Sequence, residues 1–485
     1  MKKESEIGVM EKIVALCKRR GFIYQGSEIY GGLAGTWDYG PLGVALKKNI
    51  ENLWWKTFVD SREDMYGIDS AILMNAKVWE ASGHVGGFSD PLVECSKCKK
   101  RFRADHLLER SDQVQPLSRL EVEPGERSDL CLECGGKLGE TRQFNMMFGT
   151  RIGPTADKIV VRGPLDLPQG NFALRKIKGE EVDDPARVYL RPETAQGMFV
   201  NFKNVVDSFH PKLPFGIAQV GKAFRNEISP RDFTFRAREF EIMEFEYFIR
   251  GEEWEKQFAY WQGEMMRWVD LVGIAKKNVH EIKVPEGELA HYSKRTTDLY
   301  FDFPFGQKEL YGLAYRTDFD LKNHSTFSGQ KLEYTEEGAE PITPHVIEPT
   351  FWRDRTVLAV LTSAYTEDEM NGEKRIFLKL KPALAPITIA IFPLLKNKPE
   401  LVKKAREVFD SLRSALRDTR YTLDWDDNGN IGKRYRRQDE IGTPFCITVD
   451  FDSLEKGDVT VRDRDTGKQE RVKISELTDY MRKLF

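Results

Sequence analysis

Two long stretches of the chain alternate polar and apolar residues with the period of two that β-strands impose on their side chains. They span residues 187–250 and 299–380. Antiparallel strands that pack on one face and meet solvent or a ligand on the other show this alternation. Segments such as 41–60 place apolar residues at helical spacing after a proline. The pattern predicts an α+β fold in which helices flank a mainly antiparallel sheet.

A length of 485 residues exceeds what one compact core supports, so two or three domains are expected. Residues 91–143 are polar and rich in loop-forming residues, which indicates an insertion. Residues 381–386 contain two prolines and are predicted to form a linker. We therefore expect one domain over 1–384, which carries the insertion, and a second over 385–485.

Beyond the linker, short apolar segments alternate with amphipathic ones, as in a compact α/β domain. The predicted order is strand 387–392, helix 399–417, strand 421–425, helix 430–440, strands 445–449 and 459–462, and a final helix.

Composition and apolar patterning indicate where the chain is located, but they say little about its function. A net charge of −3 neither indicates nucleic acid nor excludes a local basic patch. The first twenty residues place Ile7, Met10 and Ile13 at helical spacing and lack the continuous apolar centre of a signal peptide. The longest apolar run, 384–395, contains two prolines and is too short to cross a bilayer. We expect a cytoplasmic protein without a membrane partner.

Four of the six cysteines form two tight pairs, Cys95-Ser-Lys-Cys98 and Cys131-Leu-Glu-Cys134, and two glycines follow the second pair. Two such knuckles supply the four thiolates of a tetrahedral zinc site. In a chain without secretory features, paired cysteines favour a metal over disulfides. The sequence predicts a closed, structural Zn²⁺ site, and the two isolated cysteines are expected to be ordinary buried residues.

Residues 215–248 are predicted to form a hairpin with an arginine-rich turn. Period two puts charged and aromatic side chains on one face, namely Gln219, Gly221, Ala223, Arg225 and Glu227, then Arg238, Phe240, Ile242, Glu244 and Glu246. Arginine binds phosphate bidentately and phenylalanine stacks on planar rings, so this face suits a ligand better than a core. A surface hairpin with cross-strand ion pairs is the alternative. Residues 216–223 resemble a phosphate-binding P-loop but lack its hydroxyl and lie within a strand, so we reject that interpretation.

Two later segments have a similar character. Residues 310–321 are predicted as one strand, in which small residues beside Arg316 leave space for a small anionic group. Its polar face would carry Gly312, Ala314, Arg316, Asp318 and Asp320. A second strand is predicted to end near Pro349, and a helix to start close to Arg355, where the helix N-terminus favours anions.

These residues resemble the motifs of class II aminoacyl-tRNA synthetases. Phe224-Arg225-Asn226-Glu227 with its basic loop resembles motif 2, the segment ending in Asp354-Arg355 resembles motif 3, and residues 41–75 resemble motif 1. The C-terminal α/β domain is similar to an anticodon-binding domain. Four segments match glycyl-tRNA synthetases of the homodimeric type: Trp79-Glu-Ala-Ser-Gly-His84, Leu190-Arg-Pro-Glu-Thr-Ala-Gln-Gly197, Phe224-Arg-Asn-Glu-Ile-Ser-Pro230 and Val346-Ile-Glu-Pro349.

The resemblance, which covers nearly the whole chain, implies that glycine reacts with ATP to form glycyl-adenylate and is then transferred to the 3′ end of its tRNA. Arg225 would bind the α-phosphate, Arg236 and Arg355 the outer phosphates, and Phe240 would stack under adenine while Glu227 contacts its amino group. The implied ATP site also includes Asn226, Phe235, Glu309 and Leu310, with Glu309 on the side of Mg²⁺.

The glycine ammonium would lie among Glu193, Glu244 and Glu348, near the Thr350 hydroxyl. Arg316 would bind the glycine carboxylate, and Arg103 is expected to reach the same pocket. The implied partners are the tRNA for glycine and a second copy of the chain in a homodimer. Anticodon contacts would come from Lys433, Arg434, Arg436 and Arg437. Two other functions stay open: a synthetase for threonine or proline, and an inactive paralogue that serves as a binding subunit.

Three departures from the family's pattern involve four residues. Ala76 stands where motif 1 often has proline, which is expected to alter the dimer strand. Thr350 replaces a common serine and keeps the hydroxyl. Trp352 and Arg353 replace a glycine and a small apolar residue, so bulky side chains are expected to crowd the ATP pocket.

Overall fold

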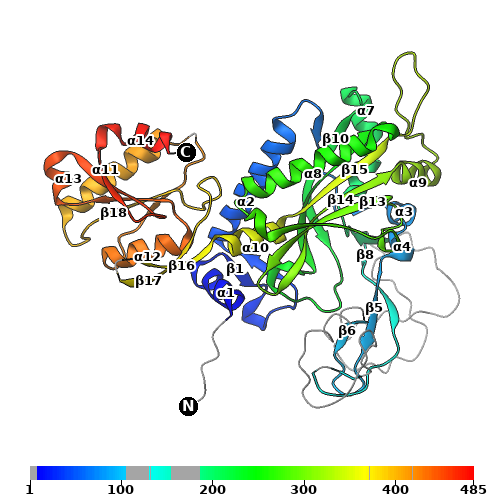
Figure 1. Cartoon of the computed structure of the whole chain (residues 1–485), viewed down its shortest axis with the longest axis horizontal. Coiled ribbons are helices and arrows are strands. Elements are labelled where there is room, and N and C mark those ends of the chain that lie inside the picture. The colour runs from blue at the N-terminus through cyan, green and yellow to red at the C-terminus, as the bar shows by residue number, and fades with distance from the viewer. Residues whose placement is uncertain are drawn as a thin grey trace.

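A computed structural model describes residues 8–104, 107, 130–131, 133–153, 186–370, 372–417 and 419–484. Its centre is a seven-stranded sheet in the order β12-β13-β14-β15-β11-β10-β3 (Figure 1). Neighbouring strands run antiparallel except β3, which pairs parallel with β10. The predicted mainly antiparallel sheet is thus confirmed. Its strands are β3 (Met65–Gly67), β10 (Phe215–Phe224), β11 (Glu239–Ile249), β12 (Val279–Lys283), β13 (Arg295–Phe303), β14 (Gly306–Thr317) and β15 (His345–Trp352).

Strand β11 shows how the sheet separates a core face from a polar face. Phe245 and Tyr247 are buried in the main core, and their rings lie 4.6 Å and 4.9 Å from that of Trp261. Glu244 and Glu246, which alternate with them, point to the other face. One period-two pattern therefore fixes both a hydrophobic core and a row of buried carboxyl groups.

Helices cover both faces of the sheet. Helices α2 (Pro41–Trp55), α8 (Trp254–Leu271) and α10 (Arg353–Ala364) pack on the core face, where Trp54, Trp268 and Val357 are fully buried. On the polar face, α6 (Ala195–Val200), α7 (Phe202–Phe209) and α9 (Phe319–Ser328) form a second, smaller core. This second core closes one end of the polar face.

The strand predicted over residues 310–321 is shorter than expected. Strand β14 ends at Thr317, whose φ of 57° turns the chain, and α9 follows. Asp318 and Asp320 therefore do not continue the strand face of Arg316. A longer strand would carry the side chain of Asp320 away from Arg316. The turn into α9 instead brings Asp320 back, so that it contacts Arg316 directly.

Two other boundaries differ from the prediction. Strand β15 does not end at Pro349 but continues to Trp352, and α10 begins at Arg353. Pro349 pairs with Leu313 inside the sheet. Ala76 is not in a strand: it begins α3 (Ala76–Ala81), for which Asn75 is the N-cap and accepts a hydrogen bond from the Lys77 amide.

The helix α1 (Val9–Arg20) is amphipathic as predicted and buries Ile13 and Leu16, whereas Ile7 lies outside the described residues. Smaller sheets surround the central one, in the orders β1-β2, β4-β9-β8 and β6-β5-β7. Their strands and the neighbouring helix are β1 (Ile23–Gln25), β2 (Trp37–Tyr39), β4 (Leu73–Met74), α4 (His84–Gly87), β5 (Ser89–Glu94), β6 (Arg101–Arg103), β7 (Arg142–Asn145), β8 (Phe148–Arg151) and β9 (Arg187–Leu190).

The C-terminal part forms a five-stranded sheet in the order β19-β18-β20-β21-β22, at one end of the molecule (Figure 1). The predicted sequence of elements is confirmed, although α13 and β22 were not predicted. The hairpin β16 (Tyr365–Met370) and β17 (Glu373–Leu378) precedes it. The remaining elements are β18 (Ile389–Pro393), α11 (Pro399–Ala415), β19 (Leu423–Trp425), α12 (Ile431–Ile441), β20 (Phe445–Val449), α13 (Phe451–Lys456), β21 (Asp458–Asp463), β22 (Gln469–Lys473) and α14 (Leu477–Lys483).

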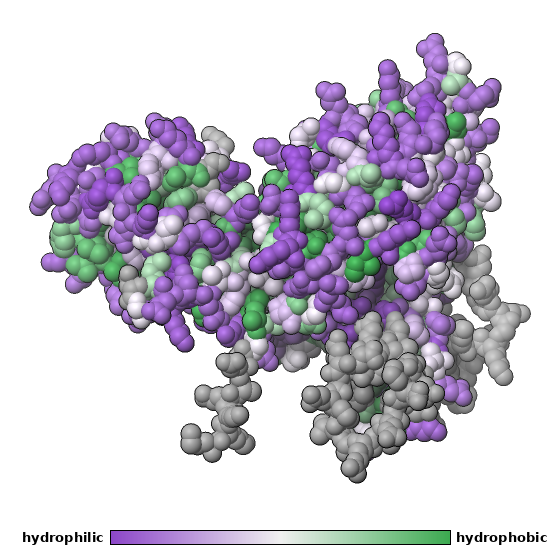
Figure 2. Space-filling view, in the orientation of Figure 1, coloured by the Kyte–Doolittle hydropathy of each residue, from purple (hydrophilic) through white to green (hydrophobic). Residues whose placement is uncertain are grey.

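The surface in Figure 2 is mostly hydrophilic, and apolar side chains on that face form small, separate groups. None of the helices formed by the described residues combines the length and apolar composition that a bilayer crossing requires.

Candidate active site

Four buried glutamates meet on the polar face of the sheet, and we call them the acidic pocket: Glu193, Glu244, Glu246 and Glu348. Glu244 and Glu246 come from β11, Glu348 from β15, and Glu193 from the turn between β9 and α6. Carboxylate oxygens of Glu244, Glu246 and Glu348 all lie within 4.8 Å of one another. Like charges at such distances disfavour ionisation unless a cation lies between them.

Two hydroxyl groups hold Glu244 in place. Thr194 Oγ1 donates to Glu244 Oε2 at 2.5 Å, and Thr350 Oγ1 donates to Glu244 Oε1 at 2.8 Å. Burial, and then the charge of Glu193, raise the pKa of Glu244. Its carboxyl group is therefore fixed in position, and a nearby positive charge would favour its ionised form.

Glu193 is held by side chains from two other segments. His84 Nε2 lies 3.1 Å from Glu193 Oε2, and Gln196 Nε2 donates to Glu193 Oε1 at 3.0 Å. Ser82 Oγ contacts the other ring nitrogen of His84 at 2.8 Å. Burial acts to raise the pKa of Glu193, but the contacts with His84, Arg316 and Gln196 outweigh it and hold the pKa below its usual value. Glu193 is the carboxylate of the pocket that stays ionised most readily.

Arg316 is the buried cation beside the pocket, and its side chain is 1% exposed. Its Nε and Nη2 each donate to Asp320 at 2.8 Å, and Nη1 donates to Glu348 at 2.8 Å. The guanidinium also lies 3.7 Å from the centre of the Tyr292 ring. Because all three nitrogens are engaged, Arg316 holds Glu348 in place, and any contact with a ligand carboxylate would have to share these donors.

Glu246 differs from its neighbours. It is fully buried, and neither carboxyl oxygen has a hydrogen-bond partner among the described residues. Burial and the charge of Glu348 raise its pKa well above the usual value, and burial also raises the pKa of Glu348. The acidic pocket thus holds four carboxyl groups, and Arg316 supplies only one positive charge beside them. An ammonium group would therefore complement the pocket.

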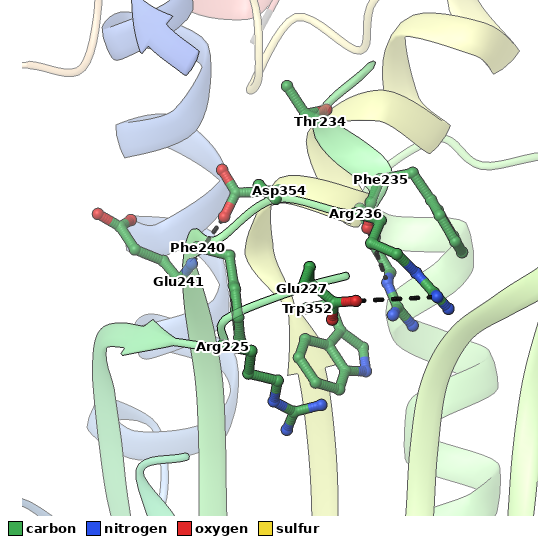
Figure 3. Close-up of a pocket in the computed structure, with 11 residues that line it drawn as sticks. Arg225, Glu227, Thr234, Phe235, Arg236, Phe240, Glu241, Trp352 and Asp354 are labelled. Atoms are coloured by element: carbon green, nitrogen blue, oxygen red, sulfur yellow. Dashed lines mark hydrogen bonds and ion pairs between the residues drawn. The ribbon is translucent and has the colours of Figure 1, made fainter. Parts of the chain in front are cut away.

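A second set of side chains lies near the end of β10 and the start of α10, and we call it the arginine pocket: Arg225, Arg236 and Arg355. Figure 3 labels Arg225 and Arg236. Arg225 donates through Nε to the Pro192 carbonyl at 3.1 Å, and its guanidinium lies 5.4 Å from the Phe240 ring. Arg236 pairs with Glu227 at 3.8 Å. Three guanidinium groups around one small cavity favour a polyanion such as a chain of phosphates.

Arg355 projects from the first turn of α10. Its Nη1 pairs with Glu309 Oε2 at 3.1 Å and donates to the Glu309 carbonyl at 3.0 Å, and its guanidinium stacks 4.5 Å from the Phe235 ring. Glu309 is also bonded by the Trp352 indole N–H at 3.0 Å. Burial acts to raise the pKa of Glu309, but Arg355 and Trp352 hold it below its ordinary value.

The two pockets are adjacent, because Arg225 and Trp352 line both of them. The cavity on the acidic side measures about 410 Å³ and includes Gly312 and Ala314, the small residues beside Arg316 that the sequence singled out. The cavity on the arginine side measures about 20 Å³. A ligand with an ammonium end and a phosphate-bearing end would bridge them.

The structure brings most of the predicted residues together, with three exceptions. Arg103 lies on β6, where it pairs with Asp90 of β5 at 2.5 Å, and it is not among the side chains that line the acidic-side cavity. Leu310 is the extra residue of a β-bulge, and its side chain is buried in the main core. Asn226 follows β10 and is not among the residues that line either cavity; its backbone N–H donates to the Met146 carbonyl at 2.8 Å.

Sequence reasoning assigned no role to Thr194, His84 or Asp320, although the first two lie inside segments that matched the family. Their places within matched segments indicated that they lie near the site, but not which glutamate each of them contacts. Asp320 had none, because its contact with Arg316 depends on the turn at Thr317.

The four paired cysteines also come together. Cys95 Sγ lies 3.5 Å from Cys134 Sγ, and Cys98 Sγ lies 3.8 Å from Cys131 Sγ. All four sulfurs are within 4.8 Å of one another. The Cys98 amide donates to Cys95 Sγ and is the main cause that lowers the pKa of Cys95 to about 6. These spacings match those of four thiolates around one tetrahedral zinc ion, for which sulfurs lie about 3.8 Å apart.

The basic helix α12 presents less charge than its sequence suggested. Arg434 is 1% exposed and donates to the Pro393 carbonyl and to two further carbonyls of the preceding loop. Arg437 pairs with Asp426 through two hydrogen bonds, and Arg436 pairs with Glu373. Arg434 cannot contact RNA in this conformation, so the prediction for it was wrong, whereas Lys433 is exposed.

An antiparallel sheet with arginines after β10 and at the start of α10, followed by a separate C-terminal α/β unit, defines a class II aminoacyl-tRNA synthetase. Comparison with known proteins agrees. Residues 388–484 match the family described as "Anticodon binding domain". The glycine–tRNA ligase of Alkaliphilus oremlandii is 48% identical, with 97% of each chain covered. Those of Caldanaerobacter subterraneus (46%; 97% of each chain) and Geobacillus thermodenitrificans (47%; 98% of this chain and 97% of the relative) are similar. The chain belongs to the glycine–tRNA ligase family.

Proposed function

We propose that the chain joins glycine to its tRNA in two steps. A glycine carboxylate oxygen attacks the α-phosphorus of ATP, pyrophosphate leaves, and a ribose hydroxyl at the 3′ end of the tRNA then attacks the glycyl carbonyl and releases AMP. The observation that carries the proposal is the acidic pocket beside the arginine pocket, since one side suits an ammonium and the other a triphosphate. The test is transfer of labelled glycine to tRNA by the purified full-length chain.

On the nucleotide side, Arg225 would neutralise the α-phosphate, and Arg236 and Arg355 the outer phosphates. Phe240 would stack on adenine and Glu227 would accept from its amino group. Glu309 would bind Mg²⁺, which supplies charge neutralisation for the departing pyrophosphate. The residues fit this ion in part, because Glu309 is already paired with Arg355 and would have to share its carboxylate.

On the amino-acid side, Glu193, Glu244 and Glu348 would surround the ammonium, with Thr350 fixing Glu244. Arg316 would reach the carboxylate while it keeps Glu348 in place. Arg103 stays a weaker proposal, since it would first have to leave Asp90. The preference for glycine over threonine or proline is supported by the relatives, which are glycine–tRNA ligases at 46–48% identity, since all three amino acids present similar charged ends to the pocket.

The acidic pocket predicts how glycine use changes with pH. Burial raises the pKa of Glu244 and of Glu348, so both stay protonated at pH values where ordinary carboxyl groups are ionised. Only the ionised forms attract an ammonium, so KM for glycine is expected to rise as the pH is lowered, and to do so at a higher pH than ordinary carboxyl groups would cause. KM for ATP should change less as the pH is lowered. Pyrophosphate exchange at saturating ATP measures this, and a glycine KM that stays constant or falls contradicts it.

We propose that Cys95, Cys98, Cys131 and Cys134 bind one structural Zn²⁺. Gly136 supports this: a Cβ there would lie 3.0 Å from Cys95 Sγ and 3.3 Å from Cys134 Sγ, so the turn is shaped around the sulfurs. Four thiolates leave no open position, so the ion would stabilise the fold of the insertion and take no part in the reaction.

Metal analysis of the purified chain should find about one zinc ion per chain. Cys98→Ser should lose most of that zinc, because a missing ligand weakens a four-thiolate site. Cys446→Ala is the matched control, since this cysteine is buried in the C-terminal sheet and should leave the zinc content unchanged. Wild-type protein that contains no zinc and has four freely titratable thiols rules out the site.

We further propose a division into a catalytic domain, 1–384, and a tRNA-binding domain, 385–485, which the match over 388–484 supports.

Exposed apolar side chains on the N-terminal loop and on α2 support a homodimer: Ile29 is 88% exposed, Tyr30 87% and Val44 51%. The four thiols that hold zinc favour a reducing compartment such as the cytoplasm.

A further inference from the structure

Trp352 lies at the centre of the arginine pocket (Figure 3). Its ring centre is 5.4 Å from that of Phe240, with the planes tilted by 49°. The guanidinium groups of Arg355 and Arg225 lie 4.4 Å and 4.9 Å from the indole. Its Nε1 donates to Glu309 Oε1 at 3.0 Å. An aromatic ring, two cations and a hydrogen-bond acceptor thus all contact one indole.

These contacts are the ones that a nucleobase would use. A purine, like an indole, is a flat bicyclic ring with N–H donors, and Phe240 and Arg355 offer it two surfaces for stacking. With the indole in place, the arginine-side cavity measures about 20 Å³, which is room for about one water molecule. The neighbouring cavity of about 410 Å³ is also lined by Trp352, so the indole has space to move into.

We propose that the Trp352 side chain occupies the position of the adenine ring and that ATP binds only when the indole swings out, so that Trp352 sets the affinity of the site for ATP. The inference rests on the proposed function, because it takes Phe240 and Arg355 as the groups that hold adenine. Trp352 ends β15 and α10 begins with the next residue, and the movement that we propose is a rotation about the side-chain bonds of Trp352.

The size of the effect follows from the population of the two indole positions. If the inward position is favoured about ten to one, the apparent affinity for ATP is about tenfold weaker than that of the open site. Trp352→Gly removes the competitor, so its dissociation constant for ATP is expected to be about tenfold lower than that of wild type. Trp352→Phe keeps a smaller ring that cannot donate to Glu309, and it should improve affinity by a few-fold.

The experiment is calorimetric titration of the full-length chain with ATP and Mg²⁺, for wild type, Trp352→Gly, Trp352→Phe and Trp425→Phe. Trp425 is a matched control, because its indole also lies against an arginine, with Arg406 at 3.7 Å, but in the C-terminal unit. The Trp425→Phe variant should bind ATP with the affinity of wild type. A second readout is the change in tryptophan fluorescence on adding ATP, which should be largely lost in Trp352→Phe and kept in Trp425→Phe.

Equal or weaker ATP binding by folded Trp352→Gly overturns the inference, and so does a fluorescence response that Trp352→Phe retains in full. If Trp352→Gly does not fold, weaker binding by Trp352→Phe has the same meaning. Glycine-dependent pyrophosphate exchange separates this failure from a failure of the proposed function. With ATP held well below its KM for wild type, wild type that exchanges with glycine, without a gain in Trp352→Gly, refutes only the role of Trp352, whereas no exchange in either protein, even at saturating ATP, refutes the function itself.

Discussion

Glu244→Gln is expected to lower kcat/KM for glycine about 100- to 4,000-fold, while the dissociation constant for ATP stays within about twofold. The carboxylate lies in a fully buried pocket and is held by Thr194 and Thr350, so it contributes a charge that the amide cannot replace. Losing one partner of a buried charge pair costs about 3–5 kcal/mol, and each 1.4 kcal/mol is about tenfold. ATP–pyrophosphate exchange measures kcat/KM for glycine, and calorimetric titration measures the dissociation constant for ATP.

The matched control is Glu239→Gln, at the start of the same strand. Glu239 is exposed and pairs with Lys222, so its loss should change kcat/KM for glycine by less than about threefold. If Glu244→Gln activates glycine as well as wild type does, the acidic pocket is not the ammonium site.

Arg316→Ala is expected to lower the free energy of unfolding by about 3–5 kcal/mol. Arg316 is buried and makes three hydrogen bonds to Asp320 and Glu348, so the variant leaves both carboxyl groups buried without their cation. Glycine activation should fall as well, since Glu348 would lose the contact that positions it. Urea unfolding followed by circular dichroism measures the change in stability.

Arg250→Ala tests whether this cost depends on burial. Arg250 pairs with Glu336 at 2.7 Å, but both side chains are about a third exposed, so the loss should not exceed about 1 kcal/mol. A similar stability change for both variants would show that Arg316 is not the buried counter-ion of the pocket.

The sequence predicted what local periodicity encodes. Alternation along residues 215–248 put Arg225, Phe240 and Glu244 on one face, because the pleat of a strand fixes side-chain direction without reference to the rest of the fold. The spacing of the cysteines likewise predicted that four sulfurs would meet, since each knuckle is a local turn.

The contacts between distant segments could not be predicted in this way. Thr194 reaches Glu244 across fifty positions of sequence, and His84 reaches Glu193 from a separate helix, so neither contact leaves a periodic signal. Arg434 was mistaken for a surface charge because its helix is basic overall, and only the packing of α12 shows which side is buried. Asp320 was placed on a strand because nothing in the local pattern marked the turn at Thr317.

Amino-acid-dependent ATP–pyrophosphate exchange by the full-length chain tests the central claim most directly. Glycine, alanine, serine, threonine and proline are compared at equal concentration, with saturating ATP and Mg²⁺. Glycine specificity, which the 46–48% identical glycine–tRNA ligases support, predicts exchange with glycine at least about 100-fold above that with any of the others. Exchange that is equal or faster with another of these amino acids, or no exchange with glycine, would contradict the assignment.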